Sequence, residues 1–251
     1  MYWWLSFLFS SSLNLHVLYN IKPETQEEKY SKLLSSLFIL STTVRAIFPR
    51  IDVERICYFN SFVSSTFIGR SLATIGEVSF ALQLSLYLLR ISKNLKITKY
   101  NLLLYLFPIF VTIAQGFCWV GVITKKQIYH CIEETIWMCS VAFLIIPTVI
   151  EILGVSKESN TQTIFIIALG LIVVYVVFMA YIDIPMYYRR YLKDEKGKTK
   201  YLTFSEGLYD CMSCNIITKK WSDWKEDYYW MFGYFSISTL LSIVIIKSPL
   251  F

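Results

Sequence analysis

Histidine is scarce in this chain of 251 residues: only His16 and His130 occur, and they lie far apart in the sequence. Clustered-histidine di-iron sites and bis-histidine haem sites need histidines that come together, so both are excluded. The segment His130-Cys-Ile-Glu-Glu has no second histidine after it, which argues against a zinc protease site. The sequence therefore predicts no metal site and no cofactor.

Charge is also low, and several sequence motifs are missing. Charged residues make up 17% of the chain and hydrophobic residues 55%, whereas a soluble domain carries more charge. Neither G-x-S-x-G nor a glycine-rich phosphate loop occurs. No basic stripe interleaved with aromatic residues lies outside the loops, so we expect no nucleic-acid partner. The composition instead predicts a membrane protein whose first partners are membrane lipids.

Seven stretches approach the length of about 20 apolar residues that a helix needs to cross the hydrocarbon core. They are 2–21, 32–48, 60–91, 100–123, 125–154, 163–192 and 221–246. The first is the weakest, because it carries Asn14 and His16. It lacks the positive n-region and cleavage site of a signal peptide, so we interpret it as a retained helix, with a divergent signal sequence as the alternative. The predicted fold is all-α, a polytopic membrane helix bundle of six or seven transmembrane helices in a single integral-membrane domain, 1–251.

One connection is long, the polar loop 193–216. Within it Thr203-Phe-Ser-Glu206 fits a capping box, which predicts either a short helix in the membrane interface or an ordinary loop. A second capping box, Thr124 with Gln127, predicts a helix that starts at Lys125. The other connections are short and charged, and a glycine followed by a polar run at 154–162 ends the fifth helix.

The lysines and arginines of the loops indicate the orientation. The loops on the N-terminal side, which we call side A, carry 14 of them, and the loops on the opposite side B carry nine. This bias predicts that the N-terminus and the 188–220 loop are cytoplasmic. All six cysteines fall in the side A half, where they would be reduced thiols in the cytoplasm or disulfides in an oxidising lumen.

Acidic residues inside or beside the apolar stretches are the strongest functional signal. A carboxylate in hydrocarbon costs roughly 2.5–3.5 kcal/mol on insertion scales, so it usually faces protein or water and has a function or a partner. Five segments bring such polar groups toward side A, and Arg45 lies near them on the second segment. The candidate ligand-binding residues are Arg70, Glu77, His130, Glu133, Glu134, Asp183, Glu226 and Asp227.

The third segment places opposite charges on one helix face. Arg70 and Glu77 are seven residues apart, or about 10 Å along the axis, which predicts that each pairs with a different helix rather than with the other. A neighbouring strip of small residues predicts close helix contact. It consists of Gly69, Ala73 and Gly76.

Two short patterns occur twice. Ile123-Thr-Lys-Lys126 recurs as Ile217-Thr-Lys-Lys220, and Glu133-Glu-Thr-Ile-Trp-Met138 recurs as Glu226-Asp-Tyr-Tyr-Trp-Met231. One interpretation is a duplication, which predicts that Glu134 and Asp227 face a shared space. The alternative is that lysine, tryptophan and acidic residues are common at helix starts and membrane interfaces.

Three functions are compatible with these features. In the first, the polar site near one leaflet binds or transports a cation, a proton or a polar lipid head. In the second, the chain is a structural subunit of a membrane complex, with other membrane subunits or copies of itself as partners. In the third, it is a membrane-embedded lipid-modifying enzyme, with His130 or a carboxylate as general acid–base and Arg70 holding a phosphate or carboxylate.

Overall fold

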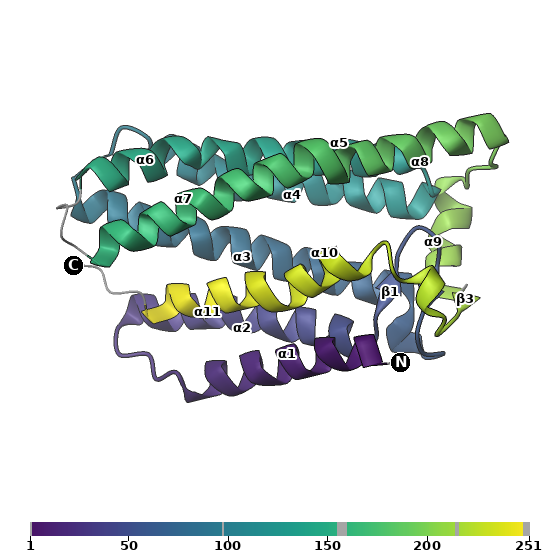
Figure 1. The fold of residues 1–251 in the computed structure, drawn as a ribbon, viewed down its shortest axis with the longest axis horizontal. Helices are drawn as coiled ribbons and strands as arrows, with labels where there is room; N and C mark the ends of the chain where they lie inside the picture. The colour runs from purple at the N-terminus through teal and green to yellow at the C-terminus, as the bar shows by residue number, and fades with distance from the viewer. Residues whose placement is uncertain (1, 97, 155–159, 214–215, 248–251) are drawn as a thin grey trace. The chain divides into compact units, whose positions relative to one another are not determined.

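A computed structural model describes residues 2–96, 98–154, 160–213 and 216–247, and it confirms the predicted all-α fold. The helices are α1 (Tyr2–Asn20), α2 (Gln26–Ile47), α3 (Thr66–Asn94), α4 (Asn101–Thr124), α5 (Gln127–Phe143), α6 (Ile145–Gly154), α7 (Asn160–Phe178), α8 (Ile184–Gly197), α9 (Phe204–Ser213), α10 (Tyr228–Gly233) and α11 (Thr239–Lys247). Figure 1 shows their course along the chain.

Five helical stretches are long and apolar enough to cross a membrane, among the described residues. They are Thr66–Asn94, Asn101–Thr124, Gln127–Ile150, Ile166–Gly197 and Tyr228–Lys247. The stretches 2–21 and 32–48 also form helices, α1 and α2, but these carry more polar residues and are not among the five.

The chain divides into two compact units that are each discontinuous in sequence. The first unit comprises Met1–Gln83, Val122–Lys125 and Leu202–Ser248, and the second is built mainly from Leu84–Gly121 and Lys126–Tyr201. Helix α3 contributes its first part to one unit and its last part to the other.

In the first unit, α1, α2 and α11 pack against one another (Figure 1). Near the first turns of α1, aromatic and aliphatic side chains form one buried cluster. Its members are Phe7, Ala46, Ile51, Tyr58, Trp224, Met231 and Phe235. A second cluster, at the far ends of the same helices, consists of Leu18, Ile39, Ile243 and Ile246. These two clusters hold the first and last helices of the chain in one bundle.

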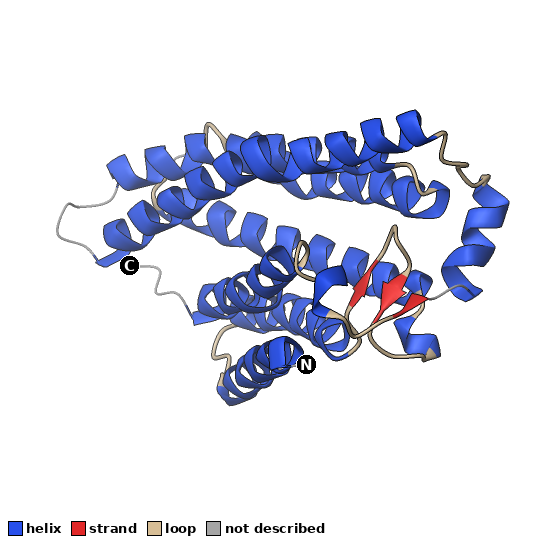
Figure 2. Cartoon of the chain, turned by 45° about the vertical axis from the view of Figure 1, so that its right-hand side comes forward, coloured by secondary structure: helices blue, strands red, loops and turns tan. Residues whose placement is uncertain are grey.

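A small three-stranded sheet, which the sequence did not predict, closes the first unit (Figure 2). Its strands are β1 (Arg50–Ile51), β2 (Ile56–Cys57) and β3 (Ile216–Ile217). β1 pairs with β2 antiparallel, and β2 pairs with β3 in parallel. The segment expected to be a short polar turn is therefore a hairpin, and it is joined to a strand about 160 residues further along the chain.

The second unit packs α5 against α8 and α7, and α6 against α7. Between α7 and α8 lies a π-helical segment, Met179–Asp183, in which the Ile184 N–H donates to the Met179 carbonyl. Pro185 follows directly and has no N–H to donate back into the preceding turn. The helix is thus irregular directly before Pro185, at Asp183.

Several helix boundaries differ from the predicted ones. The start of α5 is Gln127, with Lys126 as a cap residue that makes no side-chain cap bond, so the predicted start at Lys125 was wrong. Helix α4 continues to Thr124, and Lys125 turns the chain with a φ of 61°. The last of the five apolar stretches begins at Tyr228 rather than at 221, because residues 221–227 form a short 3-10 helix followed by a turn.

The predicted loop at 193–216 is partly helical. Helix α8 extends through Gly197. Helix α9 begins at Phe204, directly after Thr203, the first residue of the predicted capping box. The Thr203 N–H donates to Glu206 Oε2 at 2.9 Å, and the Glu206 N–H donates to Thr203 Oγ1 at 3.4 Å, as that motif requires. Residues 155–159 of the predicted 154–162 connection lie outside the described residues.

Helix α9 touches the end of α4 through a glycine. A Cβ atom added to Gly207 would lie 1.9 Å from the Ile123 carbonyl oxygen. We predict that Gly207→Ala lowers the free energy of unfolding by about 1–3 kcal/mol, because the clash is with backbone and the helix must shift.

Thermal unfolding of the purified protein in detergent measures this change. Gly233→Ala is the matched control, because a Cβ there meets nothing within 4 Å, and its stability should equal or slightly exceed that of the wild type. Equal melting temperatures for the two variants would contradict the predicted contact.

Candidate functional site

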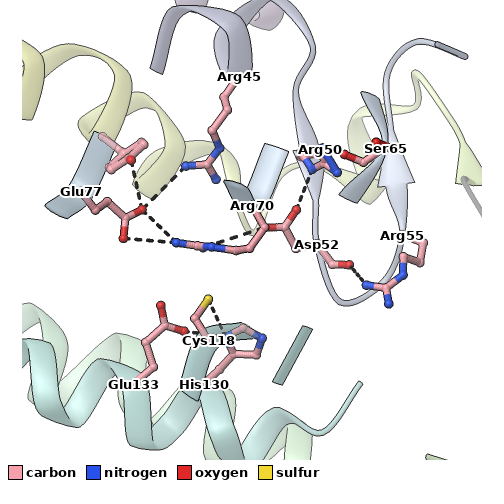
Figure 3. A network of polar contacts seen from close by, with 11 residues as sticks. Arg45, Arg50, Asp52, Arg55, Ser65, Arg70, Glu77, Cys118, His130 and Glu133 are labelled. Carbon is pink, nitrogen blue, oxygen red and sulfur yellow. Dashed lines mark hydrogen bonds and ion pairs between the residues drawn. The ribbon is translucent and has the colours of Figure 1, made fainter. Parts of the chain in front are cut away.

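Five charged side chains of the first unit form a chain of alternating sign, which we call the arginine network: Arg45, Arg50, Asp52, Arg70 and Glu77 (Figure 3). Arg50 Nε donates to Asp52 Oδ1 at 2.6 Å, and Asp52 Oδ2 lies 4.0 Å from Arg70 Nη1. Arg70 Nη2 lies 3.2 Å from both carboxylate oxygens of Glu77, and Glu77 Oε1 lies 3.8 Å from Arg45 Nη1. The three arginines are only 3–7% exposed.

Local sequence explains how these groups meet. Pro49 follows directly after the C-cap of α2, so the chain leaves the helix just beyond Arg45. Strand β1 then places Arg50 beside the start of α3, where its Nη1 donates to the Ser65 carbonyl. A Cβ on Gly69 would overlap the Arg50 guanidinium, so the glycine makes room for it. The hairpin thus brings one charged loop onto the first turns of α3.

Tyr234 extends the arginine network toward the last helix. Its hydroxyl donates to Glu77 Oε1 at 3.1 Å, and its ring lies 5.2 Å from the Arg45 guanidinium carbon. The second contact is a cation–π interaction, which favours a buried guanidinium. Tyr234 is also the first residue of the π-helical segment Tyr234–Ser238, so a helix irregularity lies at the contact.

A second ion pair joins the buried Arg55 of the hairpin to the half-buried Asp210 of α9. Arg55 Nε donates to Asp210 Oδ2 at 2.7 Å, and its Nη2 donates to the Val122 carbonyl and to Cys211 Sγ. Arg55 has a φ of 58°, the left-handed conformation that ends the hairpin turn. Burial raises the pKa of the Cys211 thiol even though Arg55 acts in the opposite direction, so Cys211 is held as a neutral thiol. This pair joins the hairpin to α9 and α4.

Within its five members the arginine network carries excess positive charge, because three guanidinium groups meet two carboxylates. Burial alone would raise the pKa of Asp52, but Arg50, Arg45 and Arg70 outweigh it and hold this pKa below its ordinary value. Asp52 is therefore ionised at neutral pH, and the excess remains. Two buried nitrogens, Arg45 Nε and Arg50 Nη2, have no hydrogen-bond partner among the described residues.

The arrangement of α3 corrects one prediction and confirms another. Arg70 and Glu77 contact each other directly, so the prediction that seven residues of separation keep them apart was wrong. Both side chains are long and extend along the helix axis, which covers the two turns between their Cα atoms. The small-residue strip is confirmed: Ala73 is fully buried, and a Cβ on Gly76 would lie 3.0 Å from the Ser41 side chain of α2.

The remaining predicted site residues fall into both units. His130 and Glu133 lie in α5 of the second unit, where Nδ1 and Oε2 are 2.8 Å apart. Glu134 is half-buried on the same helix, and Asp183 is buried at the end of the π-helical segment. The remaining predicted site residues of the first unit are Glu226 and Asp227. Glu226 is exposed, whereas Asp227 is buried and accepts a hydrogen bond from Trp230 Nε1 at 3.1 Å.

The structure unites some of these residues and leaves the rest as separate groups. Arg70 and Glu77 come together in the first unit, and His130 and Glu133 come together in the second. A single pocket that collects all eight residues stays a prediction.

The repeated patterns differ in local structure. Glu133 and Glu134 are inside α5, whereas Glu226 and Asp227 precede α10. The space that Glu134 and Asp227 were expected to share stays a prediction.

Sequence reasoning missed four residues that matter in these networks. They are Arg50, Asp52, Tyr234 and Cys118. The hairpin residues were assigned to an ordinary solvated turn. The signal that was available is the spacing of Arg50, Asp52 and Arg55 around the apolar Ile51 and Ile56, which favours a short structured hairpin over a solvated turn.

Compared with protein-family models, curated proteins and solved structures, the chain matches none. The functional argument therefore depends on the geometry of its own side chains.

Glu77 is the carboxylate with most partners in the arginine network. We predict that Glu77→Gln lowers the free energy of unfolding by about 3 kcal/mol, because Arg45 and Arg70 stay buried without the charge that compensates them. Adding Arg70→Leu to Glu77→Gln should restore part of the loss, since one of the stranded charges is removed.

Thermal unfolding in detergent measures the single and double variants. The control is Glu24→Gln, which removes an exposed partner of Lys247 and should change stability by less than about 1 kcal/mol. If Glu77→Gln melts like the wild type, Glu77 reaches water and the network is not closed.

Proposed function

We propose that this protein is a multi-pass membrane protein whose arginine network binds the phosphate-bearing head of a membrane lipid near one leaflet. The observation that carries the proposal is the pair of buried donors without partners, Arg45 Nε and Arg50 Nη2, in a network with one more guanidinium than carboxylate. Guanidinium groups bind phosphate in a bidentate, charge-assisted geometry. The five apolar helical stretches favour a lipid as the source of that phosphate.

The sign of the charge separates this ligand from the other candidates. A cation placed at Glu77 or Asp52 would lie beside Arg45, Arg50 and Arg70 in a medium of low dielectric, where repulsion between like charges is strong. A proton relay needs a carboxylate that takes up protons near neutral pH, and the lowered pKa of Asp52 opposes that role. Of the three ligands that the sequence favours, the polar lipid head therefore fits best.

The finer membrane arrangement is part of the same proposal. We infer six or seven crossings, with α1 and α2 added to the five apolar stretches, and side A in the cytoplasm. Under this arrangement the arginine network lies near the cytoplasmic leaflet, where anionic phospholipids are concentrated. The protein would then either transport the lipid or keep it bound as a permanent part of its structure, and both roles begin with the same binding of the lipid head by the arginines.

Lipid binding is tested by thermal unfolding of delipidated protein in neutral detergent, with three additions: phosphatidylglycerol, diacylglycerol without phosphate, and inorganic phosphate. Phosphatidylglycerol should raise the melting temperature and diacylglycerol should not. Inorganic phosphate alone should act only if a free anion, rather than a lipid, is the ligand.

Variants then locate the binding site. Arg45→Gln and Arg50→Lys should weaken the lipid effect roughly tenfold to a hundredfold, since each loses a charge-assisted hydrogen bond or the planar fork. Arg189→Gln removes an exposed arginine on side A and should change nothing. If all variants respond to lipid like the wild type, the arginine network is a structural brace and the protein is better described as a structural subunit.

Orientation is tested by cysteine labelling in intact cells, in a chain whose exposed Cys139 is replaced. A cysteine at Lys196 should react with an impermeant maleimide only after permeabilisation, whereas one at Lys29 should react from outside. Both lysines are exposed, so access depends on the side of the membrane alone. Labelling of position 196 from outside would reverse the proposed topology.

A further inference from the structure

Three potential metal ligands converge inside the second unit, and the arginine network does not involve them. Cys118 comes from α4, and His130 and Glu133 come from α5 (Figure 3). His130 Nδ1 lies 2.8 Å from Glu133 Oε2 and 3.9 Å from Cys118 Sγ, and the three donor atoms all lie within 4.8 Å of one another. The three residues are 1–5% exposed, so water does not compete for these atoms.

The surroundings fix the histidine ring in place. It stacks on Tyr187 of α8 with centroids 5.3 Å apart and an angle of 28°. Gly121 also lies close to the ring, and a Cβ there would be only 3.0 Å from His130 Nε2. Gly121 is three residues after Cys118, on the same face of α4, so this one helix turn supplies both the thiol and the space for the ring. The site is thus held by packing from three helices.

The distances match the edges of a metal coordination sphere. Zinc bonds are about 2.3 Å long to sulfur and about 2.0–2.1 Å to nitrogen. At tetrahedral angles, these lengths put a sulfur and a nitrogen ligand about 3.6 Å apart, and a nitrogen and an oxygen ligand about 3.3 Å apart. The observed separations of 3.9 and 2.8 Å differ from these values by about half an ångström or less. Small rotations of the Cys118 and Glu133 side chains therefore complete the geometry.

The charges of these three groups also suit a dication. A Cys118 thiolate and a Glu133 carboxylate bring two negative charges, which a divalent ion neutralises in an apolar interior. A thiolate with an imidazole favours zinc-like transition metals over magnesium or calcium, which prefer oxygen ligands.

We propose that Cys118, His130 and Glu133 bind one zinc-like divalent transition-metal ion, with a fourth coordination position left open. His130 binds through Nδ1, so its remaining proton resides on Nε2. The ion replaces the proton of the thiol and the hydrogen bond between Nδ1 and Glu133.

The test uses full-length protein in detergent, stripped with a chelator and then titrated with Co²⁺, whose spectrum reports thiolate ligation. The wild type should bind about one ion per chain and show a thiolate-to-cobalt charge-transfer band. Cys118→Ser should abolish the band, and Cys118→Ser, His130→Gln and Glu133→Gln should each weaken binding at least tenfold. Cys139→Ser, on the exposed side of α5, should leave both the band and the affinity unchanged.

Thermal unfolding with and without Zn²⁺ gives a second, independent readout. Zinc should raise the melting temperature of the wild type and of Cys139→Ser, since it binds the folded state, and should not raise that of Glu133→Gln. If the wild type shows no thiolate band, or if the three variants bind cobalt as tightly as the wild type, the proposal is wrong. The wild-type spectrum decides the question even if a variant fails to fold.

Discussion

The compensation of buried arginine charge is the constraint on which the first unit depends. A guanidinium removed from water needs an opposite charge, hydrogen-bond acceptors or a π face at short range, or its burial cost exceeds what nearby packing supplies. Arg45 has Glu77 and the ring of Tyr234, Arg50 has Asp52 and the Ser65 carbonyl, and Arg70 has both carboxylates. The elements that supply these groups must therefore hold their positions relative to one another.

That requirement explains features that would otherwise be separate. Pro49 ends α2 where the hairpin must begin, and Gly69 leaves room for the Arg50 side chain. Arg55 turns the hairpin back with a positive φ and is itself paired with Asp210. The sheet of two-residue strands is too small to be stable alone, and the ion pairs at its edge anchor it to α3 and α9.

The helices were predictable from sequence because long apolar runs bounded by charged turns specify them. Helix α4 was predicted to within one residue at each end, and the start of α9 followed from its capping box. The prediction was weaker where backbone geometry depends on tertiary contact. Strands of two residues are too short to show a hydrophobic periodicity. The 3-10 helix and turn at 221–227 depend on Trp224, which is buried against side chains of α1 and of the hairpin.

The sequence indicated which charged residues belong to the candidate site, but it did not indicate which of them pair with each other. A charge in an apolar run marks Arg70 and Glu77 from sequence, but their direct pairing depends on rotamers that spacing does not determine. Cys118 gave no signal, because an isolated cysteine among apolar residues is ordinary. Cys118 contacts His130 because the turn between α4 and α5 places the two helices side by side. The register between the two helices, which decides which residues face each other, is not visible in the sequence.

The parallel pairing of β2 with β3 has a consequence for synthesis of the chain. Residues 56–57 find their strand partners at 216–217, and Glu77 receives its hydrogen bond from Tyr234, more than 150 residues later. Because a chain is made from the N-terminus onward, the buried arginines are synthesised before the helix that carries Tyr234. The first unit therefore cannot close until its last segment, Leu202–Ser248, has been made, and most of the second unit is synthesised before that segment.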